Sequence, residues 1–85
     1  MTCLHFISSP PSSAAFKRTS ASASAGDTLV LCDDAVYAVT IDTDASVAVL
    51  WEDALARGID SPFVRADYDS LVALVCRHDK QINWG

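Results

Sequence analysis

Short apolar runs recur along the chain, separated by polar segments that contain glycine, proline or serine. The runs that predict β-strands are residues 2–7, 29–32, 47–50, 61–67 and 81–85. The second and third lack polar alternation, which favours strands covered on both faces of a parallel sheet. The fourth is shorter, and Pro62 confines its start to a strand end or an edge. Either Phe63 or Val64 is expected to point inward.

The segment between the first two predicted strands, residues 13–25, is rich in serine and alanine. One interpretation is a weak helix, capped by Ser12 or Ser13 and closed by Gly26. The alternative is a mobile low-complexity loop. We favour the helix, because two parallel strands need a crossover connection between them.

The second predicted strand runs directly into two aspartates. Asp33 or Asp34 is expected to cap a helix beginning near Ala35, because a carboxylate accepts orphan N–H groups and favours the positive helix end. Few residues remain before the third strand, so this helix is expected to have only about two turns.

Two later helices are predicted from clearer signals. Residues 51–58 carry acidic residues first and Gly58 last, which is typical of a short helix with a left-handed stop. Residues 68–78 follow Asp67, and either Asp67 or Asp69 is expected to cap them. The apolar stripe of this last helix is Leu71, Leu74 and Val75.

Strands that alternate with helices indicate an α/β fold. We predict a small three-layer sandwich, with a mostly parallel sheet of four or five strands and helices on both faces. The 85 residues are expected to form a single domain, residues 1–85.

The formal net charge of −5, with six basic residues, argues against a nucleic-acid-binding face. No apolar run is long enough to span a membrane, and no basic region announces a signal peptide. His5 and His78 lie too far apart for metal-ligand spacing, and we expect no metal or cofactor. Because 51% of the residues are apolar, an exposed apolar patch, and hence an oligomer interface, is expected.

Three cysteines, Cys3, Cys32 and Cys76, are too few and too irregular for a disulfide framework. We interpret them as reduced thiols of a cytoplasmic protein. Cys32 and Cys76 are the candidates for a persulfide-carrying thiol, but packing is the favoured interpretation for all three. Beside Cys32, the neighbouring carboxylates would raise the thiol pKa, whereas a helix N-terminus would lower it. His5 is expected to be tied by hydrogen bonds, with a site role as the alternative.

Several strings, in order, resemble the DsrH/TusB family within the wider DsrE-like fold. They are Leu4-His5, Ser9-Pro10, residues 26–38 (GDTLVLCDDAVYA), residues 49–58 (VLWEDALARG), Asp67-Tyr68, Leu71-Val72 and the late Trp84. The combination covers almost the whole chain.

The resemblance implies a non-catalytic subunit of a sulfur-relay complex. TusB-like chains assemble with TusC-like and TusD-like subunits as a dimer of heterotrimers. The complex takes persulfide sulfur from a TusA-like carrier and passes it towards a TusE-like carrier for 2-thiouridine formation at the tRNA wobble position. The reactive cysteine is expected on the TusD-like subunit.

The chain departs from the DsrH-like members, which carry a cysteine in the first helix. Residues 13–25 contain none, and the matching position falls near Thr19. The segment between Val39 and Val47 is also shorter than the family norm. A DsrH-like sulfurtransferase using one of its own cysteines remains the alternative, and an unrelated stand-alone domain is a weaker one.

Interface contacts are predicted for the aromatic residues, because buried aromatics dominate interface energetics. Without partners, the chain could form a homo-oligomer. The interface candidates are Tyr37, Trp51, Tyr68 and Trp84.

Overall fold

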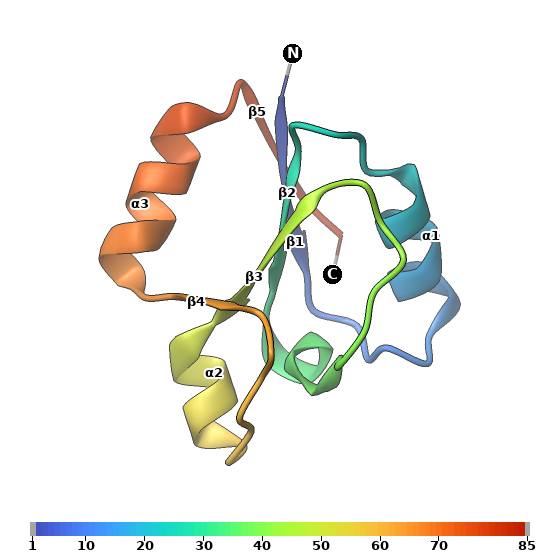
Figure 1. Ribbon diagram of the computed structural model, residues 1–85, viewed down its shortest axis with the longest axis vertical. Helices are drawn as coiled ribbons and strands as arrows, with labels where there is room; N and C mark the ends of the chain where they lie inside the picture. The colour runs from blue at the N-terminus through green and yellow to red at the C-terminus, as the bar shows by residue number, and fades with distance from the viewer. Residues whose placement is uncertain (1, 85) are drawn as a thin grey trace.

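The computed structural model describes residues 2–84 and contains a five-stranded, entirely parallel sheet with the order β4-β3-β2-β1-β5 (Figure 1). The α/β prediction is therefore confirmed, with five strands. Their bounds are β1 Cys3–Ile7, β2 Thr28–Leu31, β3 Ser46–Leu50, β4 Val64–Ala66 and β5 Lys80–Asn83.

Helices lie on both faces of the sheet. Helix α1 (Ala14–Ser22) and the 3-10 helix η1 (Asp33–Tyr37) lie on one face, and α3 (Tyr68–Arg77) lies on the other (Figure 1). The short α2 (Trp51–Ala56) continues directly from the end of β3. We call the two sides of the sheet the α1 face and the α3 face.

The α1 face carries the larger apolar core. Parallel register places Ile7 beside Leu31 and Leu31 beside Val49, and all three side chains are buried. Helix α1 adds Phe16, and η1 adds Val36, to the same cluster. Burying a side chain of this size contributes roughly 1.5–3 kcal/mol, so this layer dominates the stability of the fold.

Two predicted helix caps are confirmed. The Ser13 hydroxyl accepts the backbone N–H of Phe16 at 3.1 Å at the start of α1. The Asp67 carboxylate accepts the backbone N–H of Ser70 at 2.8 Å at the start of α3. Gly58, just past α2, has a φ of 67°, the left-handed conformation expected for a helix stop.

The prediction of a capped α-helix beginning near Ala35 is wrong. The chain forms only the five-residue 3-10 helix η1, and neither Asp33 nor Asp34 caps it with its side chain. Asp33 itself adopts a φ of 46°, because the chain turns sharply where it leaves β2. Ala35 and Val36 must reach the core within a few residues, and this favours a tight turn over a regular α-helix.

Other predictions are confirmed in part, and the end of the first helix needs a small correction. Helix α1 ends at Ser22, and Gly26 serves instead in the turn before β2, with a φ of 94°. Val64 is 72% exposed, whereas Phe63 packs against the core. The apolar stripe of α3 lies where it was predicted: Leu71, Leu74 and Val75 are the partly buried residues of the helix, although none of its ten residues is fully buried. Within residues 2–84, no helix is long and apolar enough to cross a membrane.

Candidate functional site

The carboxyl edge of the sheet brings Cys32 together with acidic residues from two segments. Cys32 follows β2 directly and is partly buried. Asp33 is the first residue of η1, and Asp53 comes from the first turn of α2. The backbone N–H of Asp33 donates to Asp53 Oδ2 at 2.7 Å, which ties the two segments together beside the thiol.

This environment holds Cys32 in its thiol form. Burial raises the pKa of the Cys32 thiol most, and the negative charges of Asp53 and Asp33 raise it further, from its ordinary 9.0 to about 11. A persulfide carrier needs an accessible thiolate in electropositive surroundings, which are the opposite conditions. The surroundings of Cys32 therefore disfavour formation of the thiolate.

One arginine lies close to these carboxylates. Arg57 Nη2 lies 3.5 Å from Asp34 Oδ1 and 3.8 Å from Asp33 Oδ1. Both aspartate side chains are more than half exposed, so these ion pairs contribute little stability. Arg57 therefore lies beside the exposed carboxylates of Asp33 and Asp34. Burial and the charge of Asp53 still have the largest effects on the pKa of Cys32.

The other two thiols lie elsewhere. Burial, and then the charge of Asp27, raises the pKa of Cys3, while Lys80 opposes this increase. Cys76 is exposed on α3, so its predicted packing role is wrong for this chain by itself. Cys3 thus begins β1, Cys32 follows β2 and Cys76 lies on α3, on three different elements.

A buried polar network joins three distant parts of the chain. His5 on β1 is 5% exposed, and its Nε2 lies 3.0 Å from Asp27 Oδ2. Asp27 also accepts the backbone N–H groups of Cys3 at 3.0 Å and Ser24 at 3.2 Å. The indole Nε1–H of Trp84 donates to His5 Nδ1 at 2.9 Å.

These contacts define the tautomer of the His5 imidazole. Because Trp84 donates to Nδ1, that nitrogen carries a lone pair, and the proton of neutral His5 sits on Nε2 and is donated to Asp27. The hydrogen bond from His5 lowers the pKa of Asp27 most; burial opposes it, and the N–H groups of Ser24 and Cys3 assist it. The interpretation of His5 as a residue tied by hydrogen bonds is confirmed.

The comparison with known protein families adds a family assignment, which the geometry alone does not give. The family model described as DsrH like protein matches residues 8–81. The chain belongs to the DsrH-like family. No curated protein matches the sequence. Proteins of this family take part in sulfur relay, generally in a complex with other relay subunits.

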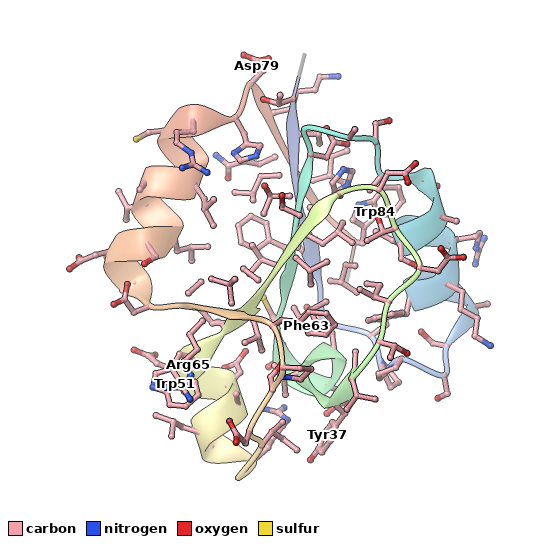
Figure 2. The ribbon with its side chains drawn as sticks, in the orientation of Figure 1. Tyr37, Trp51, Phe63, Arg65, Asp79 and Trp84 are labelled. Atoms are coloured by element: carbon pink, nitrogen blue, oxygen red, sulfur yellow. The ribbon has the colours of Figure 1, made fainter. Side chains whose placement is uncertain are left out.

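The four aromatic residues that were predicted to contact other subunits do not form one patch. Tyr37 is 49% exposed, Tyr68 72% and Trp84 43%. Figure 2 shows Trp84 on the α1 side of the sheet, well away from Tyr37 and Trp51. Trp51 is partly buried, and the Arg65 guanidinium carbon lies 3.9 Å above its ring centroid. Trp51 is therefore already engaged within the chain.

Sequence reasoning missed Asp27 as a site residue and treated it only as the start of a strand. Its role depends on His5, 22 positions away, and on backbone N–H groups whose positions only the fold defines. A polar residue next to an apolar strand was the one available signal. Among the described residues, no group of three metal-ligating side chains is brought together.

Replacing Trp84 by phenylalanine should lower the free energy of unfolding by about 1 kcal/mol, because the hydrogen bond to His5 is lost while an aromatic ring remains over the imidazole. Urea unfolding followed by circular dichroism measures the difference. Trp51→Phe, which removes an indole N–H without touching His5, is the comparison variant. Equal stability of Trp84→Phe and the unmodified chain would contradict this role of the indole.

Proposed function

We propose that this chain is a structural, non-catalytic subunit of a cytoplasmic sulfur-relay complex of the TusBCD type. In this proposal it packs against TusC-like and TusD-like subunits in a dimer of heterotrimers. The complex passes persulfide sulfur from a TusA-like to a TusE-like carrier for 2-thiouridine formation at the tRNA wobble position. The reactive cysteine belongs to the TusD-like partner.

The observation that carries the proposal is the environment of Cys32. This thiol follows β2 at the carboxyl edge of the sheet, the place where reactive groups of α/β folds gather. Burial and two carboxylates hold its pKa at about 11, which disfavours sulfur chemistry there. Family membership supports a relay role, and the disfavoured thiol supports a role without chemistry of its own.

Exposed apolar side chains support an assembly. Val39, Val64 and Tyr68 are each at least 70% exposed, although they are large and apolar or aromatic. Val64 and Tyr68 flank the short connection from β4 to α3, and neighbouring exposed apolar groups are typical of surfaces that a partner covers.

The proposal is tested by the solution mass of the chain, alone and after co-expression with TusC-like and TusD-like subunits. A stable mixed complex of about six subunits is expected. Light scattering coupled to gel filtration gives the mass, and mass spectrometry gives the composition. A chain that elutes apart from both partners would overturn the proposal.

One observation favours a second candidate, a sulfurtransferase that uses its own thiol. Cys76 is exposed on α3, where a persulfide donor could reach it. Incubation with a persulfide donor, followed by mass spectrometry, distinguishes the two functions. Added sulfur on Cys76 that a second protein then accepts would favour the sulfurtransferase. Sulfur found only on a TusD-like partner favours the structural subunit.

A further inference from the structure

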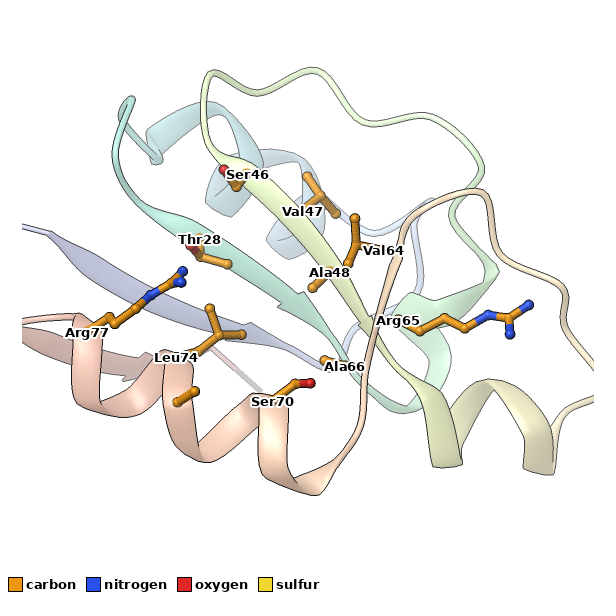
Figure 3. Close-up of a pocket in the computed structure, with 11 residues that line it drawn as sticks. Thr28, Ser46, Val47, Ala48, Val64, Arg65, Ala66, Ser70, Leu74 and Arg77 are labelled. Atoms are coloured by element: carbon orange, nitrogen blue, oxygen red, sulfur yellow. The ribbon is translucent and has the colours of Figure 1, made fainter.

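A groove of about 370 Å³ lies between α3 and the sheet (Figure 3). Its floor and walls carry small side chains from three elements: Ala48 on β3, Ala66 on β4 and Ala73 on α3. Larger side chains would normally fill the space between a helix and a sheet at native density. We call this space the α3 groove.

The groove exists because the two faces of the sheet differ in side-chain size. On the α1 face, β3 packs Val47 and Val49 against the core, whereas on the α3 face it presents Ser46 and Ala48, beside Thr28 and Val30 of β2. The alternation of side chains along each strand separates these two sets. The side chains of β3 and β4 on the α3 face, Ala48 and Ala66 among them, are therefore too small to fill the space beneath the helix.

Helix α3 is held at both ends and spans the groove. At its C-terminal end, His78 Nδ1 lies 2.7 Å from the Leu74 carbonyl oxygen and His78 Nε2 lies 2.9 Å from Thr28 Oγ1 on β2. At its N-terminal end, α3 follows the buried Ala66 and the Asp67 cap. These two attachments hold the groove open, so it is preformed.

The charged groups that line the groove are both arginines, in a chain of net charge −5. Arg65 is already engaged by the Trp51 ring and lies 3.7 Å from Asp60. Arg77 makes no ion pair with any of residues 2–84, and Figure 3 shows it extending beside Leu74 and Thr28. An apolar floor next to an unpaired guanidinium is complementary to an aliphatic group followed by a carboxylate.

The groove reaches the open edge of the sheet. Its wall includes β4, which pairs only with β3 and so ends the described sheet. Val64 on β4 and Tyr68 at the start of α3 are each 72% exposed, and Val72 on α3 is 48% exposed. Another chain can therefore approach the groove from this side and cover apolar side chains as it does so.

We propose that the α3 groove receives a segment of a partner subunit of the relay complex, with an aliphatic side chain over Ala48 and Ala66 and an acidic side chain paired with Arg77. The inference rests on the proposed function and names the docking surface that it needs. A second copy of this chain is the less suitable occupant, because two chains of charge −5 repel each other.

Two substitutions test the groove when the purified chain is titrated with purified TusC-like and TusD-like subunits. Ala73→Leu fills the groove from an exposed helix position, and Arg77→Glu reverses the unpaired charge. Each should weaken the affinity for the partner subunits by about tenfold or more. Titration calorimetry measures the affinity, and circular dichroism establishes that each variant is folded.

Matched controls carry the same chemical changes away from the groove. Ala56→Leu enlarges an exposed alanine on α2, and Arg18→Glu reverses an exposed arginine on α1, in the opposite layer. Both should bind within about twofold of the unmodified chain. Binding of the two groove variants at the level of these controls would overturn the inference.

The remaining outcomes separate the two proposals. If the complex forms and both groove variants bind normally, the groove is not the docking surface, but the proposed function still holds. The absence of any complex with the unmodified chain overturns both. A homodimer that Ala73→Leu dissociates would show that the occupant is a second copy, and it would overturn the assignment to a partner subunit.

Discussion

Replacing Asp27 by alanine should lower the free energy of unfolding by about 3 kcal/mol, a large loss for a single polar side chain. The substitution removes the acceptor for His5 Nε2–H and for the backbone N–H groups of Cys3 and Ser24. Each buried donor left without a partner costs roughly 1–3 kcal/mol, and water can reach only part of this site. Urea unfolding at neutral pH measures the loss.

The pH dependence of this difference identifies the carboxylate as its source. The pKa of Asp27 is lowered in the folded chain, chiefly by the hydrogen bond from His5, so its charged form stabilises the fold. That contribution is fully present above the unfolded value of about 4 and is lost as the pH falls through the lowered folded value. The stability gap between the unmodified chain and Asp27→Ala should therefore narrow below about pH 4.

Asp27→Asn is the matched variant for this experiment. It keeps the size of the side chain and one acceptor oxygen, but it places an NH₂ group where two donors already converge. Its loss of stability should be smaller than that of alanine. An Asp27→Ala chain as stable as the unmodified one would show that the network contributes nothing to the fold.

The parts of the fold that follow from local pattern were predictable from sequence. The apolar run of β2 is buried as expected, and β3 is buried at Ala48 and Val49, because continuous apolar residues leave no polar face. The caps at Ser13 and Asp67 were each one of the two candidates that residue type offered. These features depend on a few adjacent residues and on no distant contact.

The features that sequence did not predict depend on residues far apart in the chain. Trp84 and His5 are 79 positions apart, and only the pairing of β5 with β1 brings them together. The stripe on α3 was predicted correctly as a pattern, but the extent of its burial depends on the size of the residues opposite, and these include the small Ala48 and Ala66. A periodic pattern shows which side of a helix is apolar, but not whether the chain itself covers it.

The candidate thiol site illustrates the same limit. The carboxylate beside Cys32 was expected to raise its pKa, and Asp33 does so. The larger electrostatic contribution comes from Asp53, 21 positions further along, which reaches the thiol only because α2 packs beside η1. The expected opposing helix N-terminus is reduced to the five-residue η1.

In the folded chain at neutral pH, Cys32 should react with iodoacetamide about a hundredfold more slowly than a thiol with the ordinary pKa of 9.0, because a pKa of about 11 reduces the thiolate population by that factor. Cys76, exposed on α3, should be labelled first. Quenching at successive times, followed by mass spectrometry of the cysteine-containing peptides, gives the three rates. Labelling in urea shows that each thiol is chemically competent.

Asp53→Asn should accelerate the labelling of Cys32 several-fold, because it removes a negative charge near the thiol while an amide oxygen can still accept the backbone N–H of Asp33. Glu52→Gln, which neutralises the preceding exposed side chain, should leave the rate unchanged. If Cys32 were labelled as fast as Cys76 in the folded chain, the thiol would be activated rather than suppressed. That result would move the sulfur chemistry into this subunit and favour the sulfurtransferase over the structural role.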